Sequence, residues 1–293
     1  MNRMEQIIAR VGEIQPLPGT VVHLIGVIND PRSTVHDIVE TIRYDQALTT
    51  RMLRICNSVY FGLSREIESL EDAMRVLGTL KVLQMVMAVH TSALLNRGQD
   101  GYGLEPGVLW KQSVATALAC TAFAEHTRPS NPSLTFTAGL LHDVGKVVLN
   151  EYVVEEFGRI VRLVAERQIC FLDAEREVLG FTSTEIGARL AEKWKLPDSI
   201  VRCIRYHRTP AELDPPDVLV DTVYLANVVC MLCGIGLGAD GLSYRADAGV
   251  MGRYHLKESD LEMVGAQMLT DLKRVEAIFV EETKSPSPAG VAR

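Results

Sequence analysis

The sequence predicts an all-α protein. Apolar residues recur at intervals of three and four positions along almost the whole chain, which is the spacing that gives a helix one apolar face. The strict alternation of a half-buried strand is nearly absent. Hydrophobic residues make up 47% of the 293 residues but aromatic residues only 6%, so the core is expected to be large and aliphatic.

Residues 1–95 predict an N-terminal helical layer. Two of its helices are marked by apolar stripes, one at Ile7, Ile8, Val11 and Ile14 and the other at Val35, Ile38, Val39 and Ile42, and 29–31 ends a helix between them. Ser33 and Asp45 are placed to cap the helices that follow them, and Ser69 with Asp72 has the spacing of a capping box. The last two helices of the layer are predicted at 70–77 and 79–95.

A linker is predicted at 96–107, where the chain is rich in glycine and polar residues and has no periodicity. A helical bundle then spans 108–282, and Thr182 with Glu185 forms a second capping-box pattern. Its helices are predicted at 108–126, 134–149, 151–167, 172–179, 183–194, 198–207, 217–233 and 258–282. The last residues, 283–293, have too little apolar surface to fold and are predicted to be disordered.

The composition excludes several classes of protein. A net charge of −7 gives no overall basic surface for nucleic acid. The charged residues near the start interrupt any secretion signal, and the scattered cysteines suit a reducing compartment, so we expect a cytoplasmic protein. The stretch Thr222–Ala239 has no charge, but it contains Asn227 and three glycines. It is expected to be a buried helix that runs into a loop rather than a membrane span.

Two short motifs are expected to have no function of their own. Gly236, Gly238 and Gly241 match a dinucleotide-binding string, but a long helix precedes them where that motif needs a strand. Cys230 and Cys233 lie one helical turn apart on an apolar segment, and no second pair completes a zinc site. We expect both cysteines to serve packing.

The adjacent His142 and Asp143, in LHDVGK, are the best candidates for metal chemistry. A dication that activates water needs several histidine and carboxylate ligands and one open position. Neighbouring helix residues point about 100° apart, so these two could bracket one ion. Further ligands would have to come from other helices, and the remaining histidines show no metal-binding spacing. The alternative is a hydrogen-bonded pair at a helix end, with Gly145 as the break.

LHDVGK (141–146) resembles the signature of the HD superfamily of metal-dependent phosphohydrolases. Residues 17–62, with SLEDAMRVLG at 69–78, resemble the HDOD domain, an HD-related output domain of bacterial signalling proteins. The ordered elements include Leu17-Pro18, Asp30-Pro31, Asn57-Ser58, Tyr60-Phe61-Gly62 and Trp194-Lys195-Leu196-Pro197. The resemblance extends over about residues 15–230 and implies an HD-like bundle behind the N-terminal layer.

The resemblance also implies where metal ligands would lie. The matching positions are Gln112, His142, Asp143, Ser183, His207, Arg208 and Asn227. The family usually has histidine where this chain has Gln112, Ser183 and Arg208, and a carboxylate where it has Asn227. A neutral amide is a poor replacement for an imidazole on a transition metal. We therefore expect an incomplete remnant site without a cofactor, in which Arg208 pairs with Asp143 in place of the metal.

These expectations lead to three functional hypotheses. The first is a regulatory pseudoenzyme of bacterial signal transduction that binds signalling proteins, or a nucleotide or other phosphorylated small molecule, with no role for nucleic acid or membrane. The second is a metal-dependent phosphohydrolase or phosphodiesterase that holds a divalent transition metal with Gln112, His207 or Asn227 as unusual ligands. The third is a pure scaffold with a large apolar interface.

Two further sets of residues are candidates for binding. Lys111, Lys146 and Arg208 would supply positive charge for a phosphate around the remnant site. Polar and aromatic side chains gather directly after a predicted helix, at Asn57, Ser58, Tyr60 and Phe61. They suit recognition of a partner, whereas the alternative is a helix stop that fixes the exit of the chain.

Overall fold

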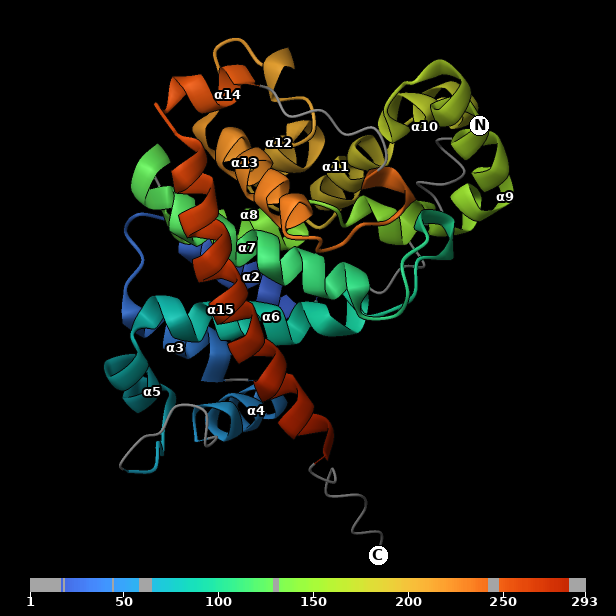
Figure 1. Cartoon of the computed structure of the whole chain (residues 1–293). Coiled ribbons are helices and arrows are strands. Elements are labelled where there is room, and N and C mark those ends of the chain that lie inside the picture. Colours follow the sequence, from blue (N-terminus) through green and yellow to red (C-terminus); the bar gives the residue numbers. More distant parts are fainter. Residues whose placement is uncertain are drawn as a thin grey trace, which may run out of the picture.

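The computed structural model describes residues 17, 19–43, 45–57, 65–128, 132–241 and 248–284. Within these ranges every regular element is a helix, apart from an isolated β-bridge between Gln99 and Leu104 (Figure 1). The predicted all-α fold is confirmed. Within the same ranges, no helix combines the length and the apolar character that a membrane span requires.

The N-terminal layer contains α2 (Gly19–Asn29), α3 (Val35–Arg43), α4 (Gln46–Cys56), α5 (Leu70–Leu77) and α6 (Thr79–Leu95). Asp45 caps α4 as predicted, because its carboxylate accepts a hydrogen bond from the backbone N–H of Leu48. The predicted cap at Ser33 is wrong. Thr34 has this role, since its hydroxyl accepts from the N–H of Asp37 and the Asp37 carboxylate accepts from the N–H of Thr34.

The second half contains the remaining α-helices of the described residues. They are α7 (Val108–Thr127), α8 (Pro132–Leu141), α9 (Gly145–Arg167), α10 (Phe171–Leu179), α11 (Ser183–Lys193), α12 (Asp198–Tyr206), α13 (Val218–Leu232), α14 (Ala248–Arg253) and α15 (Glu258–Lys284). Short 3-10 turns lie at η2 (Asp100–Tyr102), η3 (Pro210–Glu212) and η4 (Ala239–Gly241). The uncharged stretch is the buried helix α13 followed by a loop, as predicted.

The prediction of one helix over 134–149 and another from 151 is wrong. Helix α8 ends at Leu141, the chain turns through residues 142–144, and α9 runs without interruption from Gly145 to Arg167. Within the turn, hydrogen bonds span three residues, from the N–H of Val144 to the carbonyl of Leu141. The turn redirects the chain and places two polar side chains in the interior. The periodicity of apolar residues does not predict such a turn.

The segment predicted as a linker packs against the bundle. Tyr102 is fully buried, and the N–H of Gly101 donates to the side-chain oxygen of Asn150 on α9 at 2.9 Å. Gln99 and Leu104 exchange two backbone hydrogen bonds and close a small loop. A segment without periodicity can thus be well packed when glycine lets its backbone approach a helix.

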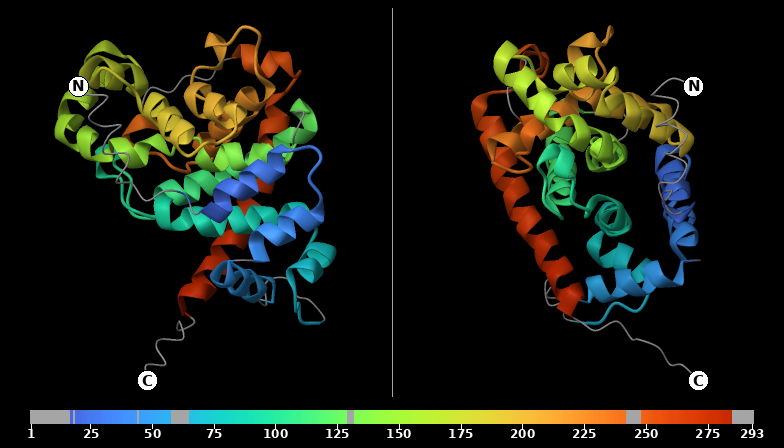
Figure 2. Two further views of the ribbon diagram at one scale, coloured as in Figure 1. Left: turned by 180° about the vertical axis from the view of Figure 1, so that it is seen from behind. Right: turned by 90° about the vertical axis from the view of Figure 1, so that its right-hand side faces the viewer.

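One hydrophobic core joins the two halves of the chain. It includes residues from Val21 on α2 to Leu272 on α15. Helices α6 and α7 lie between α2 and α3 on one side and α15 on the other (Figure 2, right). Helix α8 contacts α2, α6, α7 and α13, so it occupies the centre of the fold and carries the His-Asp turn at its end.

Candidate functional site

His142 and Asp143 lie in the turn between α8 and α9, and both are buried. The Nδ1 atom of His142 lies 2.7 Å from the carbonyl oxygen of Gly139, one helical turn earlier. A carbonyl oxygen can only accept, so Nδ1 is the donor in this hydrogen bond and Nε2 is the nitrogen left for other contacts. This hydrogen bond fixes the ring and directs Nε2 toward the carboxylate of Asp143, at 3.3 Å.

His207, directly after α12, is oriented in the same way. Its Nδ1 donates to the carbonyl of Ile204 at 2.9 Å, and its Nε2 lies 3.3 Å from Oδ1 of Asp143. The rings of His142 and His207 meet edge to face, with centroids 4.9 Å apart. One ligand atom from each of the three residues lies within 4.8 Å of the others, so among the described residues they form a candidate metal group. Burial lowers the pKa of His207 to about 4, which keeps its ring neutral.

Two cations contact the same carboxylate. Nζ of Lys146, on the first turn of α9, lies 2.7 Å from Oδ2 of Asp143, and the guanidinium of Arg208 donates to both carboxylate oxygens at 3.2 and 3.4 Å. Burial alone would raise the pKa of Asp143, but the charges of Lys146 and Arg208 outweigh it and hold the pKa well below its usual range. The carboxylate is therefore ionised and already carries two counter-charges. The expected pairing of Arg208 with Asp143 is present.

The predicted amide ligands contact each other. Nε2 of Gln112, on α7, donates to Oδ1 of Asn227, on α13, at 3.3 Å, and both side chains are buried. Neither forms a hydrogen bond to His142 or Asp143 within the described ranges. Ser183, at another ligand-like position, belongs to a different cluster.

Two further candidate binding residues, Lys111 and Asn57, have partners outside this pocket. Lys111 pairs with Glu276 on α15 at 2.8 Å, so its charge serves the contact between α7 and α15. The side chain of Asn57 donates to the carbonyl of Ile67 and accepts from the N–H of the same residue, which is the helix-stop role considered as the alternative. The other members of that set, Ser58, Tyr60 and Phe61, lie outside the described residues.

Sequence reasoning missed Glu175, a fully buried acid on α10. Its carboxylate accepts from the hydroxyl of Tyr102 at 2.6 Å and from the N–H and hydroxyl of Ser183 at 2.6 and 3.0 Å. The ammonium of Lys146 lies 5.6 Å from the centre of the Tyr102 ring. Glu175 thus connects segment 96–107 and the start of α11 to the cationic side of the pocket. One feature of the sequence could have identified it: Glu175 shares the apolar face of α10 with Phe171 and Leu179, and an acid at such a position is expected to be buried.

Replacing Glu175 by glutamine is expected to flatten the pH dependence of stability. Burial raises the pKa of Glu175 from 4.5 to about 7, although its hydrogen bonds act in the opposite direction. Its contribution to stability is therefore fully present below the unfolded pKa and is lost as the pH rises through 7. Urea unfolding should show that the free energy of unfolding falls between pH 5 and pH 8 by roughly 2–3 kcal/mol more in wild type than in Glu175→Gln.

The control for this measurement is Glu166→Gln, an exposed position on α9. It should behave as wild type at both pH values. If Glu175→Gln and wild type lose the same stability between pH 5 and pH 8, Glu175 does not titrate in this interval and the argument from its burial is wrong.

Comparison with known proteins places the chain in a family. The sequence model of the HDOD domain matches residues 14–210. An HDOD domain protein of unknown function from Geobacter sulfurreducens has a solved structure with 26% identity and a TM-score of 0.69, over 94% of this chain and 97% of that one. A protein of Marinobacter aquaeolei VT8 whose name proposes a signal transduction role is 25% identical, with a TM-score of 0.75, over 97% of this chain and 62% of that one.

An uncharacterized protein of Treponema pallidum (strain Nichols) is 29% identical over 228 residues. These residues make up 75% of this chain but 42% of that relative, so the chain spans less than half of its length. The family model, by contrast, covers more than half of the present chain and includes both the N-terminal layer and the His-Asp turn. The chain belongs to the HDOD domain family.

Proposed function

We propose that the chain is a regulatory protein of signal transduction whose His-Asp pocket binds no catalytic metal and acts through binding. The observation that carries this proposal is the pair of cations on Asp143. The carboxylate of Asp143 faces the positive charges of both Lys146 and Arg208, so it already has two cationic partners before any ion arrives. The side chains of these cations are only 1% and 8% exposed, so water screens them little.

The side chains of the His-Asp pocket are of the types that bind metals, but the positive charges beside them oppose the binding of a cation. A dication at this point would be repelled by each fixed cation, by ~1–4 kcal/mol per pair of unit charges at a separation of 4 Å. Two imidazoles and one carboxylate are available, whereas Gln112 and Asn227 use their amides on each other. We therefore derive no hydrolytic step, and assign Lys146 and Arg208 to the structural role that the metal would otherwise have.

The same observation favours protein partners over a phosphorylated ligand. Lys146 and Arg208 already contact Asp143, and little of either side chain reaches solvent. A phosphate would have to displace a carboxylate from both cations, whereas a partner protein can bind the surface without opening the pocket. The signal transduction role proposed for the Marinobacter protein is consistent with this function, which we extend to the present chain as part of the proposal.

A metal-dependent phosphohydrolase is the second candidate, and one observation favours it. Both histidines use Nδ1 on a backbone carbonyl, which leaves two Nε2 lone pairs directed at a carboxylate. Lone pairs that converge in this way repel one another unless a proton or a cation lies between them, and histidines that bind metal are usually held by this type of second hydrogen bond. Two imidazoles with one carboxylate are also a donor set that transition metals accept.

Metal analysis of protein purified without an affinity tag separates the two candidates. We expect far less than one transition metal per chain in wild type and in His142→Ala, and no turnover of bis(p-nitrophenyl) phosphate after incubation with manganese, iron or zinc. His36→Ala, which changes an exposed histidine, is the matched control. One metal per chain that disappears in His142→Ala but persists in His36→Ala, together with turnover, would establish the hydrolase and overturn our proposal.

A further inference from the structure

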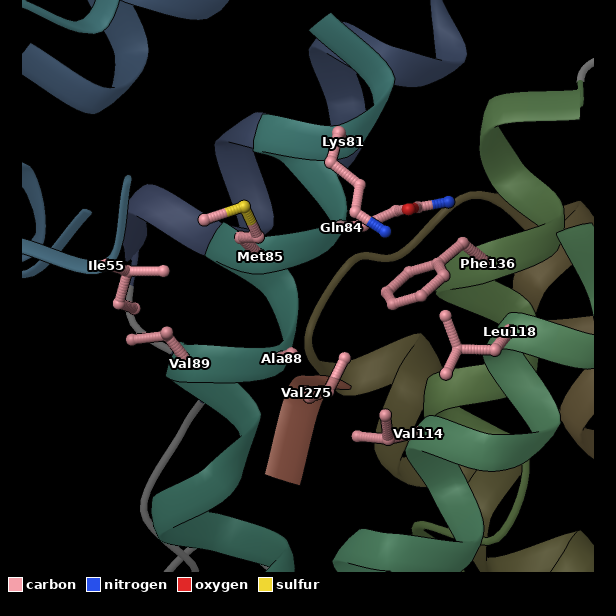
Figure 3. Close-up of a pocket in the computed structure, with 10 residues that line it drawn as sticks. All are labelled: Ile55, Lys81, Gln84, Met85, Ala88, Val89, Val114, Leu118, Phe136 and Val275. Atoms are coloured by element: carbon pink, nitrogen blue, oxygen red, sulfur yellow. The ribbon is translucent and has the colours of Figure 1, made fainter. Parts of the chain in front are cut away.

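The interior is closely packed where the N-terminal layer meets the bundle. The apolar gap between α6, α7 and α8 has a volume of about 30 Å³, which is room for about one water (Figure 3). Met85 and Val89 lie on one side of it, and Leu118 and Phe136 lie on the other. Packing therefore fixes this interface. The segment that follows α13 covers the bundle in a different way.

Residues 234–241 form a strap that crosses from the end of α13 to segment 96–107 (Figure 1). At its far end η4 contacts α10, and the backbone nitrogen of Ala239 lies 3.8 Å from the place that a Cβ would take on Gly103. Ile235, near the base of the strap, is 6% exposed, whereas Leu237 is 59% exposed. The strap thus has a buried base and an exposed middle.

Gly236 of the strap lies directly on the side chain of Gln112, near the start of α7. A Cβ at Gly236 would lie 2.5 Å from Cγ and 2.6 Å from Oε1 of that side chain. The φ angle of Gly236 is +70°, in the region that favours glycine. Gln112 is 1% exposed and therefore has little space to move aside. Only a residue without a side chain lets the strap close over it.

The closed strap leaves two polar groups beneath it unmatched. Nε2 of Gln112 donates to Oδ1 of Asn227 at 3.3 Å. Oε1 of Gln112 and Nδ2 of Asn227 are also buried, but they have no hydrogen-bond partner among the described residues. Gly236 covers Oε1 without donating its N–H to it. A buried donor or acceptor without a partner raises the free energy of the closed position, because water would satisfy both groups if the strap opened.

Apolar burial and local hydrogen bonds favour the closed position. The N–H of Ile235, whose side chain is buried, donates to the carbonyl of Cys230 at 2.9 Å and caps the end of α13. Further along, the N–H of Gly238 donates to the carbonyl of Gly236 at 2.9 Å, within the strap itself. The exposed Leu237 adds little burial. A segment with few buried apolar contacts is the kind that opens locally while the rest of the fold stays intact.

We propose that the strap is a lid over the amide pair of Gln112 and Asn227, and that it opens while the helices remain folded. Closed, it shields the pair and buries Ile235. Open, it gives water or a partner access to one acceptor and one donor between α7 and α13. Gly236 is the residue that allows closure. The inference does not depend on the proposed function, because the lid would act whether or not the His-Asp pocket binds a metal.

Thiol labelling under the strap tests the proposal. Gln112→Cys is made in a chain whose partly exposed Cys170 and Cys233 are replaced by serine. The thiol introduced at position 112 should react with N-ethylmaleimide at least about tenfold faster than those of Cys120 and Cys203, because local opening needs less free energy than global unfolding. Both native thiols are fully buried in the core. Mass spectrometry of peptides measures each rate.

Ser113→Cys in the same background is the matched control. Ser113 is also buried and is adjacent on α7, but it points about 100° away from Gln112. Its thiol should react as slowly as that of Cys120. Equal rates at positions 112 and 113, or a thiol at 112 that reacts no faster than Cys120, would mean that the strap does not open on its own and would overturn the proposal. Circular dichroism reports whether each variant is folded.

A pair of glycine substitutions tests the seat of the strap without any added thiol. Gly234 and Gly236 have similar φ angles, +74° and +70°, but a Cβ at Gly234 meets nothing within 4 Å. Amide hydrogen exchange over residues 235–241 should therefore be accelerated at least about fivefold more by Gly236→Ala than by Gly234→Ala. Adding Gln112→Ala to each should remove this difference, because the atoms that the new Cβ meets are gone. Equal acceleration by the two substitutions, or a difference that persists with Gln112→Ala, contradicts the proposal.

Discussion

Replacing Asp143 by asparagine is expected to lower the free energy of unfolding by about 3–5 kcal/mol, the cost of removing one partner from a buried ion pair. The carboxylate compensates both Lys146 and Arg208, which are almost completely buried. A neutral amide of the same shape removes the carboxylate charge that faces both cations, which lie close together in the interior and repel each other. Urea unfolding at pH 7 in the presence of EDTA measures this loss without any contribution from a metal.

Two further variants show whether the loss has this cause. Asp143→Asn combined with Arg208→Met should be more stable than Asp143→Asn alone, because one of the two cations that faced the carboxylate is removed. Asp214→Asn, at an exposed position, should change stability by no more than about 0.5 kcal/mol. Unchanged stability of Asp143→Asn in EDTA would mean that the carboxylate does not neutralise the two cations.

The second large effect is expected for Gly145→Ala. A Cβ at Gly145 would lie 1.8 Å from the carbonyl oxygen of Ser183 and 2.7 Å from the backbone nitrogen of Gly187, so it cannot be accommodated without moving α9 away from α11. Overpacking of this kind typically costs 1–3 kcal/mol, and we expect about 3 kcal/mol or more here because both obstacles are backbone atoms. Thermal and urea unfolding measure the loss.

Gly158→Ala is the matched control on the same helix. A Cβ at Gly158 meets nothing within 4 Å. Alanine has a higher helix propensity than glycine, so this substitution should stabilise the protein by up to about 1 kcal/mol. Opposite signs for the two substitutions would confirm that Gly145 is required by the close approach of α9 and α11. A stabilising effect at both positions would contradict it.

The helices whose ends are marked by caps could be predicted closely from the sequence. The capping box of Thr182 and Glu185 placed the start of α11, and both of its hydrogen bonds are present. The pattern at Ser69 placed the start of α5, although the carboxylate of Asp72 pairs with Arg65 instead of closing the box. Caps are local interactions, so residues within one turn are sufficient to define them.

The site could be predicted only in part, because its contacts join residues far apart in the chain. Resemblance to the family singled out His142, Asp143 and His207. Because Arg208 occupies the position of the family's second histidine, it was expected to pair with Asp143. Periodicity did not reveal the turn at 142–144, since a reversal between two buried helices keeps the apolar pattern. Nor did it reveal the bond between Tyr102 and Glu175, which spans 73 residues and depends on how segment 96–107 packs.

Anomalous diffraction from crystals grown with manganese or zinc tests the central claim most directly. If Lys146 and Arg208 neutralise Asp143, the map should show the guanidinium of Arg208 against the carboxylate and no anomalous peak beside it. A fully occupied ion about 2 Å from Nε2 of His142, Nε2 of His207 and the carboxylate of Asp143 would contradict the claim.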